Sequence, residues 1–308
     1  MDTKNNGTGK LLSGAMGLAA GISFGFGGAV SSLIGAQGFS VMHIVMAQFI
    51  CAVIIMGVLT IFSKRPKFSA KTIAKLAVLG AVSTISSITY YLAIDLLSVG
   101  SAVAIQFQYV WMTVVIQAIA ERKAPNGLVI VAVFMVIVGT LFASGLADEF
   151  LSGAFTANAL GLVFALICAV FYALFIFFNG RIAPDEPAAP RTFVMVSGGF
   201  IVALFVGGDL FLNPSELFAL LPGGLVLGLM MSVIPVLCIV GASSRLPGGI
   251  VAILTSTELP AAVLAGALIF GDTVTPLVVI GVVLILVSVA LVEGGDALKL
   301  KQLNKDPA

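Results

Sequence analysis

Long apolar runs separated by short polar segments dominate this chain. Breaks at Gly, Pro and charged clusters divide it into ten runs of roughly the 20 residues that a membrane-spanning helix needs. The runs cover 11–34, 41–63, 72–96, 98–120, 126–144, 158–180, 191–208, 217–243, 247–270 and 274–292. Pro222 leaves open whether the eighth helix begins at 217 or after the proline. Since the alternating segments of about 10 residues that mark membrane barrels are absent from the sequence, the pattern predicts an all-α membrane protein with ten transmembrane helices.

The basic residues predict the orientation. With both termini in the cytoplasm, every Lys and Arg falls on the cytoplasmic side, as the positive-inside rule requires. These residues are Lys4, Lys10, Lys64, Arg65, Lys67, Lys71, Lys75, Arg122, Lys123, Arg181, Arg191, Arg245, Lys299, Lys301 and Lys305. The outer loops carry only the acids Asp95, Asp148, Glu149, Asp209, Glu216 and Asp272. We therefore expect an even number of spans and no buried Lys or Arg.

The composition agrees and excludes several functions. Of 308 residues, 60% are hydrophobic and 9% charged, whereas a soluble domain carries about 25% charged residues. The basic residues cluster in loops rather than in a stripe, so we expect no nucleic-acid partner. Cys51, Cys168 and Cys238 lie inside apolar runs without metal-ligand spacing. A phosphate-binding loop is also missing from the sequence, so we expect no metal, no cofactor and no nucleotide-driven step.

The two halves of the sequence repeat each other. The matching segments are Gly17-Leu18 with Gly161-Leu162, Phe49-Ile50 with Phe200-Ile201, and 99–124 with 248–274. We expect a first repeat at 11–144, an external linker at 145–157 and a second repeat at 158–292, with cytoplasmic tails at 1–10 and 293–308. Because each repeat has five helices, the second would be inserted upside down. Inverted repeats of this kind are typical of alternating-access transporters.

These features resemble the drug/metabolite transporter superfamily, in its ten-helix branch with two EamA-type domains. The resemblance rests on the duplication, on the small-residue stretch leading to Glu258-Leu259-Pro260, on Asp272 before the last hairpin and on Gly281. It implies a secondary transporter whose central cavity is lined mainly by helices one, three, four, six, eight and nine.

The chain departs from this family in two places. Where the second helix often carries an Arg ahead of a Phe, this chain has Gln48. Where the fourth helix often has a Pro, this chain reads Gln108-Tyr109-Val110-Trp111. The first departure removes a positive charge and makes an anionic substrate less expected.

Glu258 is the main candidate for chemistry, since it is the one carboxylate predicted at mid-depth. A charge there costs several kcal/mol unless it is paired, hydrated or protonated, so ionisable residues inside a membrane indicate function. With no basic residue expected beside it, we predict that Glu258 contacts the substrate and exchanges protons. The alternative is a structural carboxyl hydrogen-bonded to neighbours such as Thr255.

Polar and aromatic residues complete the predicted site. The fourth helix presents an inward stripe of Gln106, Tyr109, Thr113 and Gln117, which lines a cavity or holds helices together. Tyr90, Tyr109, Trp111 and Tyr172 lie near mid-depth, where aromatic faces can enclose an organic cation or simply pack. We include Gln106, Tyr90, Tyr109, Trp111 and Tyr172 among the substrate-binding candidates.

The second helix adds two candidates. His43, near its outer end, could relay protons or hydrogen-bond among the lipid headgroups. Gln48 lies almost two turns deeper on the same face, and we include it as a substrate-binding candidate.

The sequence thus predicts a secondary active transporter that works by alternating access in the cytoplasmic (inner) membrane of a prokaryote. Its substrate would be a small organic metabolite such as an amino acid or amine, moved with proton coupling through Glu258 and His43. A quaternary ammonium compound such as choline is the alternative substrate. Apart from substrate and membrane lipid, we expect no obligatory partner, because both repeats lie in one chain.

Two other classes remain as alternatives, a channel and an intramembrane hydrolase that uses Ser23 and His43. The hydrolase rests on a nucleophile-elbow pattern, Gly21-Ile22-Ser23-Phe24-Gly25, which requires a strand–turn–helix setting. Here the pattern lies in an apolar helix, where Gly17, Gly21, Gly25 and Gly28 predict a groove for a neighbouring helix.

Overall fold

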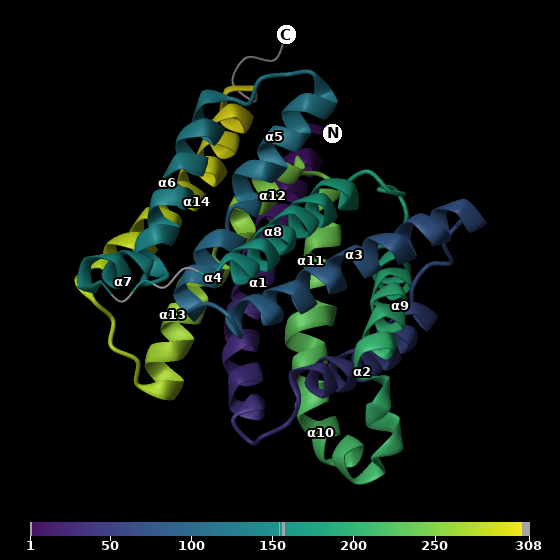
Figure 1. Ribbon diagram of the computed structural model, residues 1–308. Helices are drawn as coiled ribbons and strands as arrows, with labels where there is room; N and C mark the ends of the chain where they lie inside the picture. The colour runs from purple at the N-terminus through teal and green to yellow at the C-terminus, as the bar shows by residue number, and fades with distance from the viewer. Residues whose placement is uncertain (1, 154, 156–157, 304–308) are drawn as a thin grey trace.

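The computed structural model describes residues 2–153, 155 and 158–303, with side chains over 9–153, 155 and 158–294. Within these residues the chain is helical and contains no strand (Figure 1). The α-helices are α1 (Asp2–Gly35), α2 (Val41–Ile61), α3 (Ala70–Ile94), α4 (Val99–Gln106), α5 (Tyr109–Glu121), α6 (Gly127–Ala143), α7 (Leu146–Ser152), α8 (Ala159–Asn179), α9 (Ala188–Gly207), α10 (Pro214–Leu227), α11 (Ile234–Ser243), α12 (Gly248–Thr255), α13 (Glu258–Ala265) and α14 (Pro276–Leu303). The 3-10 segment η1 (Gly208–Leu212) and the π-helical segments η2 (Gly228–Val233) and η3 (Gly266–Phe270) lie between them.

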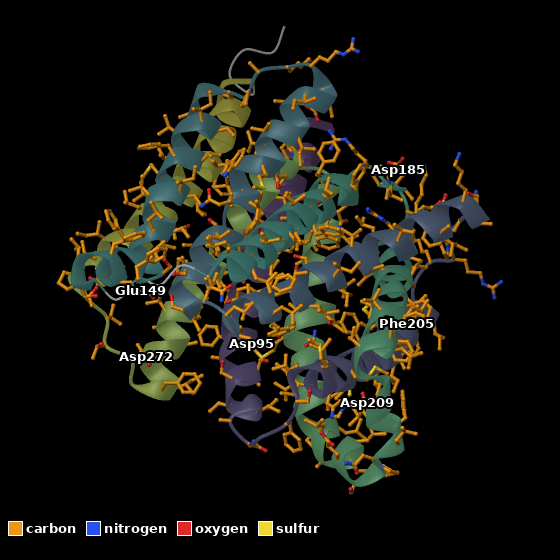
Figure 2. The ribbon with its side chains drawn as sticks, in the orientation of Figure 1. Asp95, Glu149, Asp185, Phe205, Asp209 and Asp272 are labelled. Carbon is orange, nitrogen blue, oxygen red and sulfur yellow. The ribbon has the colours of Figure 1, made fainter. Side chains whose placement is uncertain are left out.

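In the described part of the chain, nine helical spans are long and apolar enough to cross a membrane. The pair α6 and α7, bent by 54°, makes a tenth if it is counted as one span. Large apolar side chains point outward, among them Phe205, which is 86% exposed (Figure 2). The chain is therefore an integral, multi-pass membrane protein. The eighth span begins at Pro214 and continues through Pro222, which removes one backbone hydrogen bond without ending the helix.

The fourth and ninth spans are interrupted near their middles. In the ninth, Pro260 has no N–H and its ring crowds the carbonyl of Ser256, so α12 ends before Glu258 and α13 begins there. The hydroxyls of the residues at this break donate to carbonyls three residues earlier: Thr255 to Ala252, Ser256 to Ile253 and Thr257 to Leu254. The fourth span breaks at 107–108, which lies 149 residues before 256–257 and thus at the same place in the repeat.

Glycines allow several of these helices to approach closely. A Cβ on Gly80 of α3 would overlap the carbonyl oxygen of Met195 on α9, and a Cβ on Gly198 would overlap that of Ala77. The predicted groove on the first helix is confirmed for Gly17, Gly21 and Gly25, which pack against Leu254, Thr257 and Ala261 respectively. Gly28 has nothing within 4 Å of an added Cβ and faces a cavity instead.

The prediction that no Lys or Arg is buried is wrong for Arg191. The helix α9 starts at Ala188, three residues earlier than predicted, and its first turn places Arg191 inside the protein at 1% exposure. Its Nη2 donates to the carbonyl of Asn179 at the end of α8, and its Nε has no hydrogen-bond partner among the described residues.

Candidate functional site

A cavity of about 440 Å³ lies between the two halves of the chain. Its walls run from the middle of the helices to one end of the bundle, reaching Gly35, Val41, Ile94, Val99 and Asp272. These residues flank the acidic loops, and Figure 2 places Asp95, Asp209 and Asp272 toward this end, away from the chain termini. The cavity therefore extends from mid-depth toward the end opposite the basic loops.

Glu258 lies on the cavity wall as the first residue of α13. Its carboxylate makes no hydrogen bond or ion pair with any residue that the structure describes. Among the residues with described side chains, no Lys, Arg or His belongs to the lining, and the buried Arg191 is not part of it. Asp272, near the mouth, is the other acid of the lining. The cavity thus combines two carboxylates with no basic group.

Aromatic rings form much of the remaining wall. Tyr172 packs edge-on against Phe24, with ring centroids 6.3 Å apart, and Tyr90 and Tyr91 lie side by side at 6.1 Å. The hydroxyl of Tyr172 is buried without a hydrogen-bond partner in the described structure, so it could bond to water or a ligand. Sequence reasoning omitted Phe24 and Tyr91. The glycines around Phe24 were the available signal for this helix face, because Gly25 and Gly28 line the cavity too.

Both predicted glutamines reach the cavity. Gln48 of α2 donates through Nε2 to the hydroxyl of Ser232 in η2, at 2.9 Å. Gln106, the last residue of α4, lies on the opposite side of the repeat break from Tyr109. Cys168 also lines the wall and contacts the hydroxyl of Ser86. Of the predicted substrate-binding residues, Glu258, Gln106, Gln48, Tyr90 and Tyr172 share one cavity.

Tyr109 and Trp111 do not line this cavity. Tyr109 is fully buried beneath its floor, where its hydroxyl hydrogen-bonds with Thr255 at 3.2 Å and its ring packs edge-on against Tyr172 at 4.6 Å. The indole of Trp111 donates to Gln108 at 2.8 Å. Because the fourth span breaks at 107–108, its second part, α5, packs against α12 and does not line the cavity.

Ser23 and His43 are not paired. The Ser23 hydroxyl donates to the carbonyl of Met230 at 2.7 Å, within the π-helical segment η2. His43 lies outside the cavity lining, with Nδ1 2.7 Å from a carboxylate oxygen of Glu216 and Nε2 3.2 Å from one of Asp209. This cluster links α2 to η1 and α10 at the acidic end of the bundle.

We expect His43→Ala to lower stability rather than proton coupling. The substitution leaves the half-buried Glu216 carboxylate without its ring partner, at a cost of about 1–3 kcal/mol. Thermal unfolding of the detergent-solubilised protein should show the loss, with a smaller loss for His43→Gln, which keeps one donor. Unchanged stability together with lost pH dependence of transport would instead support a proton relay.

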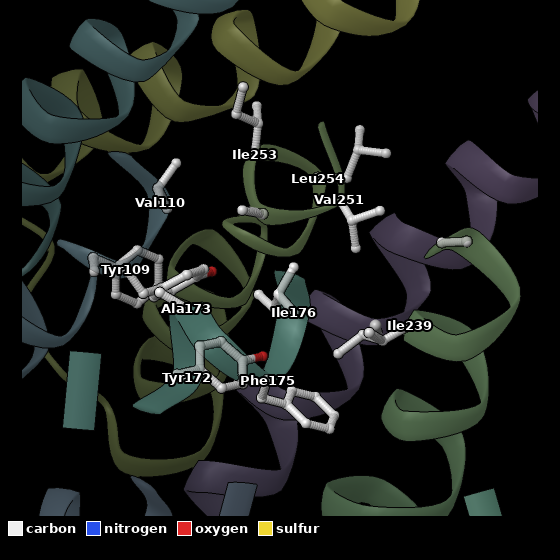
Figure 3. Packing of buried hydrophobic residues seen from close by; sticks show 14 of the residues in the cluster. Tyr109, Val110, Tyr172, Ala173, Phe175, Ile176, Ile239, Val251, Ile253 and Leu254 are labelled. Carbon is white, nitrogen blue, oxygen red and sulfur yellow. The ribbon is translucent and has the colours of Figure 1, made fainter. Parts of the chain in front are cut away.

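The other end of the cavity is closed by a layer of buried side chains, which we call the inner plug. It consists of Tyr109, Val110, Ile176, Val251, Ile253 and Leu254 (Figure 3). Beyond the plug, the backbone N–H of Gly249 donates to Gln117, and Arg181 pairs with Glu121 at 2.7 Å. A second cavity of about 360 Å³, lined in part by Lys10, Lys123 and Arg245, lies at this basic end.

Comparisons with known proteins give the family. A solved structure titled "Crystal structure of protein" is similar with a TM-score of 0.64 and 15% sequence identity, over 92% of this chain and 98% of that chain, which shows the fold alone. A search of curated proteins finds no match. The EamA-like transporter family matches twice, over residues 12–145 and 159–294. The chain therefore belongs to the EamA-like transporter family and carries two copies of its domain, which confirms the resemblance drawn from the sequence.

Proposed function

We propose that this protein is a secondary transporter that exchanges a small organic cation, either a protonated amine or a quaternary ammonium compound, for protons. The observation that carries the proposal is Glu258, which has no partner among the described residues and lies in a cavity whose described walls are aromatic and carry no basic side chain. A volume of about 440 Å³ is within the range of small-molecule sites. A positive ligand would offset the buried charge of Glu258 and could stack on Tyr172, Tyr90 and Phe24.

An amino acid substrate fits this cavity less well. Its carboxylate would need a positive partner, and the cavity wall offers only neutral donors such as Gln48 and Gln106. The two acids of the wall would repel it. The charge balance therefore favours an amine without a carboxylate.

Coupling follows from competition at one carboxylate. A cation is attracted to ionised Glu258 but gains little from the protonated form, so proton and cation exclude each other. Lowering the pH increases the protonated fraction and weakens cation binding, whereas raising the pH strengthens it. A transporter that changes between its two states with either a proton or a cation on Glu258 moves one across the membrane in exchange for the other.

The packing of the helices supports alternating access by inverted repeats. Exchanging the two halves turns the contact of α3 with α8 into that of α11 with α1, and the contact of α3 with α9 into that of α10 with α2. The pairs α2–α9 and α6–α14 map onto themselves. With five spans in each half, this exchange corresponds to a two-fold axis in the membrane plane. With the basic loops and both termini in the cytoplasm of a prokaryotic cell, the cavity faces outward.

The proposal is tested by ligands that differ only in charge. Purified protein is screened by thermal shift against choline and against 3,3-dimethyl-1-butanol, in which carbon replaces the charged nitrogen. We expect stabilisation by choline or a related amine, more at high pH than at low pH, and none by the neutral analogue. Equal shifts with both compounds, or a preference for carboxylate-bearing analogues, would refute a cation site.

A further inference from the structure

The exchange symmetry of the two halves fails most clearly between the fourth and ninth spans. Helix α5 packs against α12, and α12 also packs against α8. Exchanging the halves would pair α4 with α13 and α4 with α1, and the structure has no comparable contact for either pair. The contact of α5 with α12 lies at the basic end of the bundle. Helices α4 and α13, which lack the corresponding contact, lie at the acidic end, to which the cavity extends.

We propose that α4 and α13 form the outer gate of the inward-facing state, through residues that are the repeat counterparts of the inner plug. This inference rests on the alternating access proposed above. If the two halves exchange conformations between the states, each contact that closes the inner end has a counterpart that closes the outer end. The structure thus supplies the contacts of a state that it does not itself show.

The central contact of this outer gate joins Glu258 and Gln106. An offset of 149 residues superimposes the two helix breaks and relates Tyr109 to Glu258, and Gln106 to Thr255. The hydrogen bond between Tyr109 and Thr255 at the inner end therefore corresponds to one between Glu258 and Gln106 at the outer end. The protonated carboxyl of Glu258 can donate its O–H to the amide oxygen of Gln106, and the amide N–H can donate to the other carboxyl oxygen. Gln106 is thus a positioning residue that satisfies Glu258 when it holds a proton instead of a cation.

A second contact of the gate lies nearer the mouth. At the inner end, a Cβ on Gly248 would lie 3.6 Å from the Thr113 side chain, which is ordinary contact distance. The counterparts are Val99 of α4 and Ala262 of α13, which both line the cavity in the present state. In each pair one partner is small: Gly248 leaves room for Thr113 at the inner end, and Ala262 leaves room for Val99 at the outer end.

Disulfide cross-linking tests the gate in a background with Cys51, Cys168 and Cys238 replaced by Ala. The outer pair is Val99→Cys with Ala262→Cys, and the inner pair is Thr113→Cys with Gly248→Cys. Under oxidation of membranes, we expect both pairs to cross-link and each to stop transport reversibly, because each locks one state. Adding Gln106→Leu should slow outer cross-linking by roughly tenfold, the size expected when a buried carboxyl loses its hydrogen-bond partner.

The control pair, Val41→Cys with Ala262→Cys, shares a cavity-lining residue with the outer pair. By the repeat its counterparts lie in α9 and α5, which do not pack together, so we expect no cross-link. Failure of the outer pair in a parent protein that transports cations would overturn the gate. A parent that transports no cation, with both pairs still cross-linking, would refute the proposed cargo and leave the gate standing. Equal rates with and without Gln106→Leu would remove the assigned role of Gln106.

Discussion

Glu258→Gln is expected to abolish pH-dependent transport while leaving the protein folded. The amide is nearly isosteric with the carboxyl, but it does not titrate and carries no negative charge to attract a cation. Since Glu258 has no described partner, its replacement breaks no ion pair within the fold. We expect cation affinity to fall at least about tenfold, which corresponds to ~1.4 kcal/mol. Uptake into proteoliposomes at two internal pH values measures the effect, beside the thermal unfolding of the same preparation.

Asp95→Asn is the matched control, because it removes one negative charge from the same end of the bundle at an exposed site outside the cavity. It should leave both the rate and the pH dependence of transport unchanged. A Glu258→Gln protein that still responds to pH like the wild type would contradict the role given to this carboxyl.

Gly80→Ala is expected to cause a large loss of stability. A methyl group at this position overlaps the carbonyl oxygen of Met195, and a backbone atom inside a packed helix cannot move aside cheaply. The substitution forces α3 and α9 apart, at an expected cost of about 1–3 kcal/mol, which is typical of overpacking. Thermal unfolding should show the loss, and Gly198→Ala on the facing helix should behave in the same way.

Gly57→Ala is the control for this prediction. Its added methyl group meets only the ring of Phe193, 3.6 Å away, so it fits without displacement. Alanine also has the higher helix propensity, so we expect stability to be unchanged or raised by up to ~1 kcal/mol. Equal effects of Gly57→Ala and Gly80→Ala would mean that α3 and α9 do not cross as described.

The predicted spans came close to the observed helices because the thickness of the bilayer sets how many consecutive apolar residues each helix needs. Arg191 was misplaced because a charge at the edge of an apolar run reads as a loop residue. Only the tertiary structure shows that the first turn of α9 packs this side chain over Asn179. The sequence also left open whether the eighth helix begins before or after Pro222, because a proline removes one backbone hydrogen bond. In the structure α10 continues through Pro222.

Within the candidate site, the mid-depth position of Glu258 could be anticipated, since charges inside a membrane are rare and costly. Tyr109 was expected on the cavity wall because the polar stripe assumed an unbroken fourth helix. The turn at 107–108 instead places Tyr109 beneath the floor, against Thr255. The partners of His43 lie 166 and 173 residues away in the chain, and no local pattern connects them.

Counting the protons released on ligand binding tests most directly whether Glu258 holds either a proton or an organic cation. Choline, or the best amine from the thermal-shift screen, is added to detergent-solubilised protein in weak buffer with a pH-sensitive dye. At a pH where free Glu258 is protonated, we predict release of about one proton per cation bound, and none from Glu258→Gln. Cation binding of equal affinity in both proteins, without proton release at any pH, would contradict the account.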